Sequence, residues 1–538
     1  MSALARRDGR TGADSPDVSR ETALVRVGRL TLLLLALAAQ AVSAPRFEAV
    51  DTGSRHAYTG GWEHFVGGGV AVFDCDGDHL PEIFMAGGES PSALLRNRSD
   101  RGGPIRMTEE TPEALELQDV TGAYPLDIDD DGILDLAVLR VGPDLLLRGR
   151  GGCGFAPFED LGFESGDWWS TAFSATWEGT NVLPTMVFGT YVDRSDPEGP
   201  FEACDAPRLY RPDGARYRPP LALAPGACAL SALFSDWGRH GRRDLRLSND
   251  RHYYVSRGEE QLWAMEARPR LYGPGDGWRT YRIWGMGIAS RDLDGDGLPE
   301  VFLTSMADQK LQSLSGPGPL FVDAPYDRGI TAQVPYAGDD GRPSTGWHAA
   351  FGDVDLDGLD DLFIAKGNVE QMPSNAMYDP NNLLMQGPDG RFSEVGLAAG
   401  IANGAKSRGA ALADLDGDGR LDLVVVNRSA PFELYRNETE VDGHWVALLP
   451  MQHAPNRFAV GAWIELALDG RRIWRELTVG GGHAGGIAGP EHLGLGSADT
   501  ARVRVHWPDG ATSGWTDLAA DRAWMLERTG AGLRAVEF

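Results

Sequence analysis

The stretch "DLDGDGLPEVFL", residues 292–303, places four carboxylates within nine positions, those of Asp292, Asp294, Asp296 and Glu300. An apolar run of the kind found in strands begins directly after the last of them. Carboxylates this close together repel one another. The cluster beside a strand therefore calls for a structural or functional explanation.

The same pattern recurs along the chain. Four more copies of Asp-x-Asp-x-Asp-x-x-x-(Asp/Glu), each followed by apolar residues, begin at Asp74, Asp127, Asp353 and Asp414. Two eroded copies fill the gap in the series, "WEGTNVLPTMVF" from Trp177 and "DWGRHGRRDLRL" from Asp236. The regular spacing of the seven starts indicates one supersecondary unit repeated seven times.

Each repeat is β in character. An apolar run such as "GVAVF" leads in, and a β-branched run such as "LVVVN" leads out. The 70 glycines and 33 prolines favour many turns, and so many short strands. Seven antiparallel sheets close most simply as a propeller, although a straight solenoid is an alternative. We therefore predict an all-β fold with a seven-bladed β-propeller over residues 46–438.

The acidic loops have the spacing of a site for a hard cation. Residues 1, 3 and 5 of a tight loop point inward, a glycine at position 6 allows the turn, position 7 offers its carbonyl, and an acid at position 9 closes the shell. Because all the ligands are oxygens, Ca²⁺ is favoured, with about five sites. The Leu298 carbonyl is the expected backbone ligand of the opening stretch. The predicted side-chain ligands are Asp74, Asp76, Asp78, Glu82, Asp127, Asp129, Asp131, Asp135, Asp292, Asp294, Asp296, Glu300, Asp353, Asp355, Asp357, Asp361, Asp414, Asp416, Asp418 and Asp422.

The simpler alternative is that these segments are solvated acidic turns, since Asp and Gly are ordinary turn residues. An ordinary turn does not require acids at positions 1, 3, 5 and 9 together, whereas a metal site does. The joint presence of the four acids therefore favours the metal. His79 replaces the glycine of the first loop, in a conformation uncommon for other residues. No ligands are assigned to the loops at Trp177 and Asp236. We expect Ca²⁺ to act as a structural fastener rather than as a signal.

The N-terminus has the pattern of a signal peptide, predicted over residues 1–41. Arg26 and Arg29 precede the apolar run 30–39, and small residues stand at the −3 and −1 positions of a cut after Ala41. An uncleaved anchor is the alternative. The prediction implies a secreted protein, extracellular or periplasmic, with no membrane span in the mature chain.

The net charge limits the possible partners, and the cysteines indicate disulfides rather than a zinc site. The formal charge of −28 argues against nucleic acid as a partner and favours cations or basic surfaces. Export favours disulfides, and the four cysteines allow three pairings. Cys204 with Cys228 closes a local loop and is the favoured pair, which leaves Cys75 with Cys153. No Cys-x-x-Cys motif supports zinc.

With these motifs the chain resembles a known family. The repeats are similar to FG-GAP/VCBS repeats, the calcium-binding propeller blades also found in integrin α-subunits. The tail, residues 443–530, resembles an ASPIC/UnbV domain in "GHWVALLP", "TVGGGHAGG", "HLGLG" and "VRVHWPDG". This order of domains is that of the cartilage acidic protein family and its bacterial relatives. The resemblance implies an exported calcium-binding propeller with a β-rich C-terminal domain, and no known reaction.

A ligand site is predicted at the end of the propeller opposite the acidic loops. The inner strands begin there, and their aromatic and basic residues are expected to converge on the central opening as a funnel. The alternative is that each Trp packs between blades. The candidates are Trp62, His64, Trp168, Trp284, Trp347, His348, Lys406 and Arg408.

The predicted function is that of a binding, adhesion or scaffold module for an unknown protein or glycan partner. A secreted enzyme with its active site in the funnel is the competing hypothesis. Enzyme motifs such as Gly-x-Ser-x-Gly and His-Glu-x-x-His do not occur in the sequence. The glycine-rich "GGGHAGG", residues 480–486, is predicted to be a flexible loop.

Overall fold

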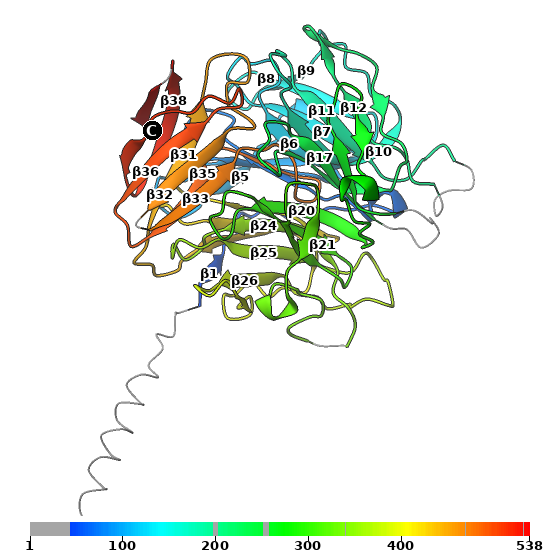
Figure 1. Ribbon diagram of the computed structural model, residues 1–538. Helices are drawn as coiled ribbons and strands as arrows, with labels where there is room; N and C mark the ends of the chain where they lie inside the picture. Colours follow the sequence, from blue (N-terminus) through cyan, green and yellow to red (C-terminus); the bar gives the residue numbers. More distant parts are fainter. Residues whose placement is uncertain (1–43, 197–202, 251–257, 339–340, 469, 531) are drawn as a thin grey trace, which may run out of the picture. The chain divides into compact units, whose positions relative to one another are not determined.

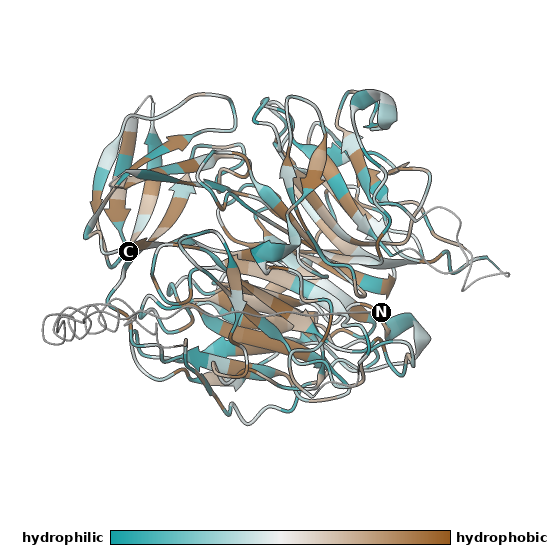
Figure 2. Ribbon diagram, turned by 60° about the horizontal axis from the view of Figure 1, so that its bottom comes forward, coloured by the Kyte–Doolittle hydropathy of each residue, from teal (hydrophilic) through white to brown (hydrophobic). Residues whose placement is uncertain are grey.

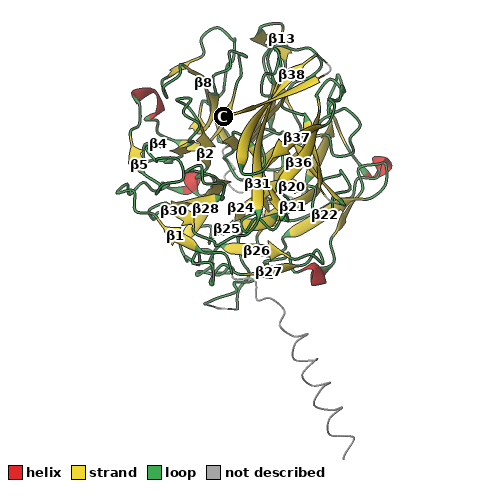
Figure 3. Cartoon of the chain, turned by 90° about the vertical axis from the view of Figure 1, so that its left-hand side faces the viewer, coloured by secondary structure: helices red, strands yellow, loops and turns green. Residues whose placement is uncertain are grey.

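A computed structural model describes residues 44–196, 203–250, 258–338, 341–468, 470–530 and 532–538, so the predicted signal peptide lies outside the described residues. Residues Pro45–Phe538 form one compact unit. Strands, yellow in Figure 3, make up nearly all of its regular structure. Within the described ranges no helix is long and apolar enough to cross a membrane. Short 3-10 turns occur at η1 (Trp62–His64), η2 (Glu113–Leu115), η3 (Pro274–Asp276) and η4 (Tyr326–Arg328).

Between residues 45 and 438, the described ranges contain seven antiparallel units of four strands, here called sheets 1 to 7 in chain order; units 2 and 3 are joined in one eight-stranded sheet, and β34 from the C-terminal part adds a fifth strand to unit 1. Sheet 1 has β2 (Val70–Phe73), β3 (Glu82–Met85), β4 (Ala93–Asn97) and β5 (Met107–Glu109). Sheet 2 has β6 (Val120–Leu126), β7 (Asp135–Gly142), β8 (Leu145–Gly149) and β9 (Phe155–Pro157). Sheet 3 has β10 (Trp168–Thr176), β11 (Thr185–Thr190), β12 (Arg208–Tyr210) and β15 (Leu221–Ala222), with the hairpin β13 (Pro212–Asp213) and β14 (Arg216–Tyr217) inserted. β10 also pairs briefly with β7, which joins sheets 2 and 3.

The later sheets repeat this arrangement. Sheet 4 has β16 (Ala229–Ser235), β17 (Asp244–Asn249), β18 (Gln261–Ala264) and β19 (Arg270–Leu271). Sheet 5 has β20 (Gly285–Arg291), β21 (Glu300–Ser305), β22 (Lys310–Leu314) and β23 (Phe321–Asp323). Sheet 6 has β24 (Gly346–Gly352), β25 (Asp361–Lys366), β26 (Asn382–Gln386) and β27 (Phe392–Glu394). Sheet 7 has β28 (Lys406–Ala413), β29 (Asp422–Arg428), β30 (Glu433–Asn437) and, from the start of the chain, β1 (Phe47–Ala49).

The seven sheets close into a ring. The first strands contact one another in the order β2, β6, β10, β16, β20, β24 and β28, and β28 contacts β2 again. β1 completes sheet 7 by pairing with β30, with Phe47 opposite Asn437. In Figure 1 the blue β1 accordingly lies with the yellow-green strands of the later sheets. The first and last repeats are therefore held together by backbone hydrogen bonds.

The repeat positions read from the sequence coincide with strand boundaries. Position 1 of every repeat follows directly on the last residue of an inner strand, as Asp292 follows β20 and Trp177 follows β10. Position 9 is the first residue of the second strand in all seven sheets, including Glu300 of β21 and Thr185 of β11. The eroded repeats thus keep the strand–loop–strand geometry, although the repeat from Asp236 lacks acids at positions 3 and 5 and the repeat from Trp177 lacks all four acids.

The C-terminal strands, orange to red in Figure 1, form two further four-stranded sheets. One sheet has the order β35 (Glu491–Gly496), β31 (His444–Met451), β38 (Arg522–Thr529) and β39 (Gly532–Glu537). The other has the order β33 (Arg471–Glu476), β32 (Trp463–Leu468), β36 (Thr500–His506) and β37 (Thr516–Ala519). Buried side chains from both sheets, such as Leu448 and Val503, make a common core.

The glycine-rich segment between these sheets runs along the centre of the ring, and the prediction of a flexible loop is wrong. This axial segment, residues 478–488, ends in β34 (Ile487–Ala488), which pairs in parallel with β2. Its backbone exchanges hydrogen bonds with inner strands of sheets 1 to 5. Glycine is required because a Cβ on Gly485 would lie 2.1 Å from the Val70 oxygen, and one on Gly69 would lie 1.8 Å from the Ala484 oxygen.

Hydrophobic side chains are concentrated on the strands, which are largely brown in Figure 2. Two disulfides add covalent ties, Cys204–Cys228 and Cys75–Cys153, which confirms the favoured pairing. Cys75 occupies position 2 of the first acidic loop, and Cys153 lies in the turn between β8 and β9 of sheet 2. The second disulfide therefore links a candidate metal loop to the neighbouring sheet.

Candidate metal centres and the opposite end of the ring

The five acidic loops share one hydrogen-bonding scheme. In the loop of sheet 5, the position-1 carboxylate of Asp292 accepts the N–H groups of Gly295 (2.8 Å) and Gly297 (3.0 Å). The position-9 carboxylate of Glu300 accepts the N–H of Leu293 at 2.9 Å. These bonds fix the acids of positions 1 and 9 against the loop backbone before any ion is considered.

All five loops repeat the bond from the position-6 N–H to the position-1 acid and the bond from the position-2 N–H to the position-9 acid, whereas the position-4 N–H bond recurs in the loops of sheets 1, 5 and 7. Asp414 accepts the N–H groups of Gly417 (2.8 Å) and Gly419 (2.9 Å), and Asp422 accepts that of Leu415 (2.9 Å). The position-6 residues all have positive φ, including His79 at 67°. Position 4 is also left-handed in each of the five loops, which the sequence does not reveal where it is Asp130 (φ 63°) or Leu356 (φ 58°).

The scheme brings carboxylate oxygens together. In four of the loops three acids offer ligand atoms that lie within 4.8 Å of one another. These triads are Asp74 with Asp76 and Asp78, Asp127 with Asp129 and Asp135, Asp292 with Asp294 and Asp296, and Asp353 with Asp355 and Asp357. The triads could hold metal ions.

Burial makes the clustered charges costly. It raises the pKa of Asp292 to about 6 and that of Glu300 to about 7, and neighbouring loop carboxylates add to the rise. Burial likewise raises the pKa of Asp127 and of Asp414 to about 7. Carboxylates in this state gain stability from a cation placed among them, because a cation removes both the desolvation cost and the repulsion.

Unpartnered oxygens show where such an ion fits. Oδ1 of Asp76, Oδ1 of Asp129 and Oδ1 of Asp353 are buried and have no hydrogen-bond partner. Buried acceptors normally have a partner, so these three oxygens are candidate ligand atoms for a cation. The residues present therefore suit a hard divalent cation bound by oxygen.

Three of the loops have an arginine partner from the third strand of their own sheet. The fourth residue of the third strand is Arg96 in β4, Arg148 in β8 and Arg436 in β30, and each guanidinium pairs with a loop acid, Arg148 with Asp129 at 2.7 Å. The equivalent residues are Ser313 in sheet 5 and Met385 in sheet 6. The acidic loops of sheets 5 and 6 lack this third-strand arginine, although Asp360 in the loop of sheet 6 pairs with Arg475 of β33 at 2.5 Å.

Side-chain amides connect consecutive loops around the ring. The donors end the third strands of sheets 1, 7 and 6, and each donates to the position-2 carbonyl of the preceding sheet's acidic loop. The bonds are Asn97 Nδ2 to Leu415 O (2.7 Å), Asn437 Nδ2 to Val354 O (2.9 Å) and Gln386 Nε2 to Leu293 O (3.4 Å). An ion that orders one loop therefore also steadies a strand of its neighbour.

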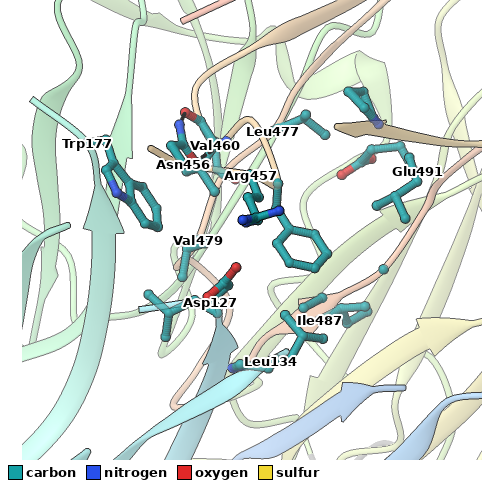
Figure 4. A pocket seen from close by; sticks show the side chains of 18 residues that line it. Asp127, Leu134, Trp177, Asn456, Arg457, Val460, Leu477, Val479, Ile487 and Glu491 are labelled. Atoms are coloured by element: carbon teal, nitrogen blue, oxygen red, sulfur yellow. Dashed lines mark hydrogen bonds between the residues drawn. The ribbon is translucent and has the colours of Figure 1, made fainter. Parts of the chain in front are cut away.

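The eroded loop at Asp236 contacts the C-terminal sheets, as do acidic loops through Asp130 with Arg457 and Asp360 with Arg475. Glu476 of β33 accepts the Asp236 N–H at 2.9 Å and a hydrogen bond from the Ser235 hydroxyl. Arg239 at position 4 lies over the Trp474 ring, 4.0 Å from its centroid. Figure 4 shows a small pocket beside the other eroded loop, where Trp177, together with Asp127 of the acidic loop of sheet 2, faces Val460, Arg457 and Leu477.

At the opposite end of the ring, several predicted funnel residues lie in a packed cluster. Trp347 is fully buried and Trp169 is 1% exposed, with Trp62 and Trp284 packed against them. Trp169, not Trp168, joins this cluster; Trp168 lies instead under the Arg208 guanidinium, 4.8 Å away. A ligand at this end would have to displace packed side chains.

The polar funnel residues are held by the protein itself. The buried Arg408 guanidinium lies 3.9 Å from the Trp347 ring centroid, and Lys406 Nζ pairs with Glu370 at 2.9 Å. His348 Nδ1 accepts the His483 N–H of the axial segment at 3.0 Å, and burial lowers its pKa to about 4. A neutral imidazole used as a backbone acceptor is a structural arrangement.

His64 is separate from these groups. It is 4% exposed, and its ring nitrogens lie 3.8 Å from Glu89 Oε1 and 3.6 Å from Asp119 Oδ1. Burial lowers its pKa despite these carboxylates.

Comparisons with known proteins agree with the motifs. A model of the ASPIC and UnbV family matches residues 452–532, and a model of the FG-GAP-like repeat matches residues 353–425. Cartilage acidic protein 1 of Homo sapiens is 25% identical over 163 residues, which are 29% of this chain and 24% of that protein. The chain thus spans about a quarter of the length of the curated relatives it matches.

Among solved structures, an Agrocybe aegerita lectin that recognises non-reducing terminal N-acetylglucosamine aligns with 69% of this chain and 93% of its own, at 15% identity and a TM-score of 0.38. The extracellular domain of a putative hybrid two-component system from B. thetaiotaomicron aligns with 90% of this chain and 58% of its own, at 8% identity and a TM-score of 0.42. Both TM-scores are low.

Proposed function

We propose that this chain, which carries an FG-GAP-like repeat and a C-terminal ASPIC/UnbV domain and is distantly similar to cartilage acidic protein 1, is an exported calcium-binding protein. The ring of seven sheets acts as a seven-bladed β-propeller whose blades are stabilised by Ca²⁺. The propeller serves as a binding, adhesion or scaffold module for a protein or glycan. The two disulfides are compatible with an oxidising compartment outside the cytoplasm.

One observation carries the metal assignment, namely that five loops far apart in the sequence share two backbone hydrogen bonds to the acids of positions 1 and 9, around clustered acids that are partly buried. Backbone donors satisfy the oxygens that face the loop and leave others, such as Asp353 Oδ1, without a partner. Ca²⁺ accepts six to eight oxygen ligands in flexible geometry, which suits loops that differ in detail. Bound Ca²⁺ would neutralise the acids and tie the inner strand of each blade to the next strand.

The metal content decides this part of the proposal. Protein purified from residue 42 onward is dialysed against Ca²⁺ or Mg²⁺ and analysed by elemental analysis. We expect about one Ca²⁺ for each acidic loop and little Mg²⁺, which demands stricter octahedral geometry. Retention of no Ca²⁺ by folded protein would overturn it.

The module assignment needs a separate test, because among the described residues the predicted funnel contains a packed Trp cluster. The protein is screened with and without Ca²⁺ against extracellular proteins and a panel of glycans. Saturable binding without chemical change of the partner supports a module. Turnover of a bound glycan, lost in a His348→Ala variant that keeps its fold and its Ca²⁺, would establish the enzyme hypothesis instead.

A further inference from the structure

A large cavity lies between the acidic-loop side of the ring and the C-terminal sheet that contains β31 and β38. Its volume is about 550 Å³, within the usual range of small-molecule sites. Phe351 and Leu412 of the inner strands line one side, and Leu449 and Met525 line the other. The smaller pocket of Figure 4, about 60 Å³, shares Ile487 and other lining residues with it.

The C-terminal wall of the cavity is apolar because β31 carries apolar side chains on both faces. Val446 and Leu448 are fully buried in the core of the C-terminal sheets. The alternate residues of the strand line the cavity, namely Trp445, Ala447, Leu449 and Met451. Antiparallel strands with one face toward solvent normally alternate apolar and polar residues, so the second apolar face indicates that it borders an apolar site.

Three neighbouring strands contribute one row of residues to this wall. Ala447 of β31 pairs in register with His492 of β35 on one side and with Ala523 of β38 on the other. All three residues line the cavity. The two alanines leave space that larger side chains would fill, and the row therefore places one polar side chain beside an apolar space.

His492 uses one ring nitrogen and leaves the other without a partner. Its Nε2 lies 2.8 Å from the carbonyl oxygen of Gly419, which can only accept, so Nε2 carries a proton and donates it. Burial lowers the pKa of His492 to about 4, so the ring is neutral at pH 7 and Nδ1 is an acceptor. This Nδ1 is buried and has no hydrogen-bond partner. Stacking on Trp445, with 5.8 Å between the ring centroids, fixes the orientation of the imidazole.

Two other buried side-chain atoms of the described lining lack a hydrogen bond, and both have another role. Arg291 Nε faces Asp360 Oδ1 at 3.8 Å, and Asp76 Oδ1 is a candidate metal ligand. The four carboxylates of the lining already have backbone N–H groups or arginines as partners. His492 Nδ1 is thus the buried acceptor that an occupant of the cavity can satisfy.

From this combination of an apolar sheet face and one unused acceptor, we propose that the cavity binds a small, neutral, largely apolar molecule with one hydrogen-bond donor, a hydroxyl or N–H group. The apolar body lies against β31 and β38, and the donor faces His492 Nδ1. A charged ligand is disfavoured, because it would leave water for an apolar space whose own charges are already paired. This site is separate from the metal loops and from the partner surface of the proposed module.

Three fluorescent probes with the same four-ring body test the ligand class. 1-Hydroxypyrene is neutral and has a donor, 1-methoxypyrene is neutral without a donor, and 1-pyrenemethylamine is a cation at pH 7. Each probe is titrated into protein purified from residue 42 onward, in Ca²⁺, and its Kd is measured by fluorescence. We expect 1-hydroxypyrene to bind at one site. The other two should bind about tenfold more weakly or worse, because the methoxy group leaves Nδ1 unpaired and the cation must be desolvated.

Variants locate the probe in the cavity. His492→Gln keeps an N–H group for the Gly419 carbonyl and removes the acceptor at Nδ1, so the hydroxyl and methoxy probes should then bind equally. Ala447→Phe should fill the space and abolish binding of both, and Ala523→Phe replaces it if that variant does not fold. The matched control is Ala519→Phe, at an exposed position of β37 outside the lining, which should bind like the unchanged protein.

Each outcome decides one part of the proposal. Failure of 1-hydroxypyrene to bind, or unchanged binding to a folded variant with the space filled, would overturn the cavity as a ligand site. Equal affinity of the unchanged protein for the hydroxyl and methoxy probes, or tighter binding of the cation, would overturn the ligand class. None of these readouts measures metal content, so a failure of the Ca²⁺ proposal is recognised separately by elemental analysis.

Discussion

The substitution Asp294→Asn tests whether Asp294 is a metal ligand or an ordinary turn residue, because the two cases predict changes in stability of opposite sign. The amide keeps the shape of the side chain and the oxygen that accepts the Asp296 N–H at 3.2 Å. It removes one negative charge from the triad with Asp292 and Asp296. Without metal the substitution relieves repulsion and should leave the protein equally or more stable, whereas with Ca²⁺ it should weaken the site and lower stability.

The size of the effect follows from binding linkage. A site with a Kd of about 10⁻⁴ M contributes about 1.4 kcal/mol at about 1 mM Ca²⁺. Unfolding of a cooperative unit as long as Pro45–Phe538 releases about 1 kcal/mol/K of entropy, so the loss of one site lowers Tm by about 1.4 °C. Removal of Ca²⁺ from all five loops of the unchanged protein would lower it by about 7 °C.

Scanning calorimetry of the unchanged protein and the variant provides the assay, in Ca²⁺-free buffer, in Ca²⁺ and in Mg²⁺. Asp389→Asn is the matched control, because Asp389 Oδ1 accepts the Arg391 N–H at 3.1 Å in the same kind of turn, between β26 and β27 and outside the acidic loops. The reasoning is refuted if Asp294→Asn shifts Tm equally with and without Ca²⁺, or if its Ca²⁺ response matches that of the control.

Three further substitutions test the fold around the sites. Phe47→Ala should lower the free energy of unfolding, measured by urea titration, by about 3–5 kcal/mol, because its 6%-exposed ring packs into sheet 7. The control Glu48→Ala, at an exposed position of β1, should change it little. Equal losses in the two variants would contradict closure of the ring by β1. Gly485→Ala should lower Tm and expose the axial segment to proteases, because its Cβ would collide with β2. The control is Gly489→Ala, whose Cβ meets no atom within 4 Å. Similar behaviour of the two variants would contradict the close packing of the axial segment against β2. Burial raises the pKa of Glu476 to about 7, so the folded state holds its proton more tightly than the unfolded state and this group costs stability as pH rises from about 4.5 to above 7. Glu476→Gln should therefore gain Tm relative to the unchanged protein between pH 5 and pH 8, and a difference that is constant with pH would contradict this.

The strand boundaries could be predicted because they depend on local sequence. An apolar run, an acid at position 1 and an acid at position 9 mark the end of one strand and the start of the next, and Asp292 and Glu300 lie at those boundaries. The turn at position 6 was equally predictable, even for His79.

Features that depend on distant partners could not be predicted. β1 has three residues and no usable periodicity, and its partner β30 lies at the far end of the ring sequence. The glycines of the axial segment suggest flexibility, because nothing near them in sequence reveals the strands that press against them. Register irregularities near the start of six inner strands, such as that between Ser170 and Ala172, alter which side chains face the centre, and so Trp169 rather than Trp168 joins the cluster.

Closure of the ring by β1 also has a consequence for biogenesis. The Arg46 N–H donates to the Thr439 hydroxyl oxygen, 393 residues further along the chain, so the earliest strand to emerge during synthesis waits for nearly the whole repeat array before it finds its partner. A topology dominated by such remote contacts folds slowly, and its unpaired strand edges are open to aggregation in the meantime. For the exported calcium-binding protein proposed above, this step would follow translocation, and we expect the Ca²⁺ concentration during folding to determine the yield of native protein.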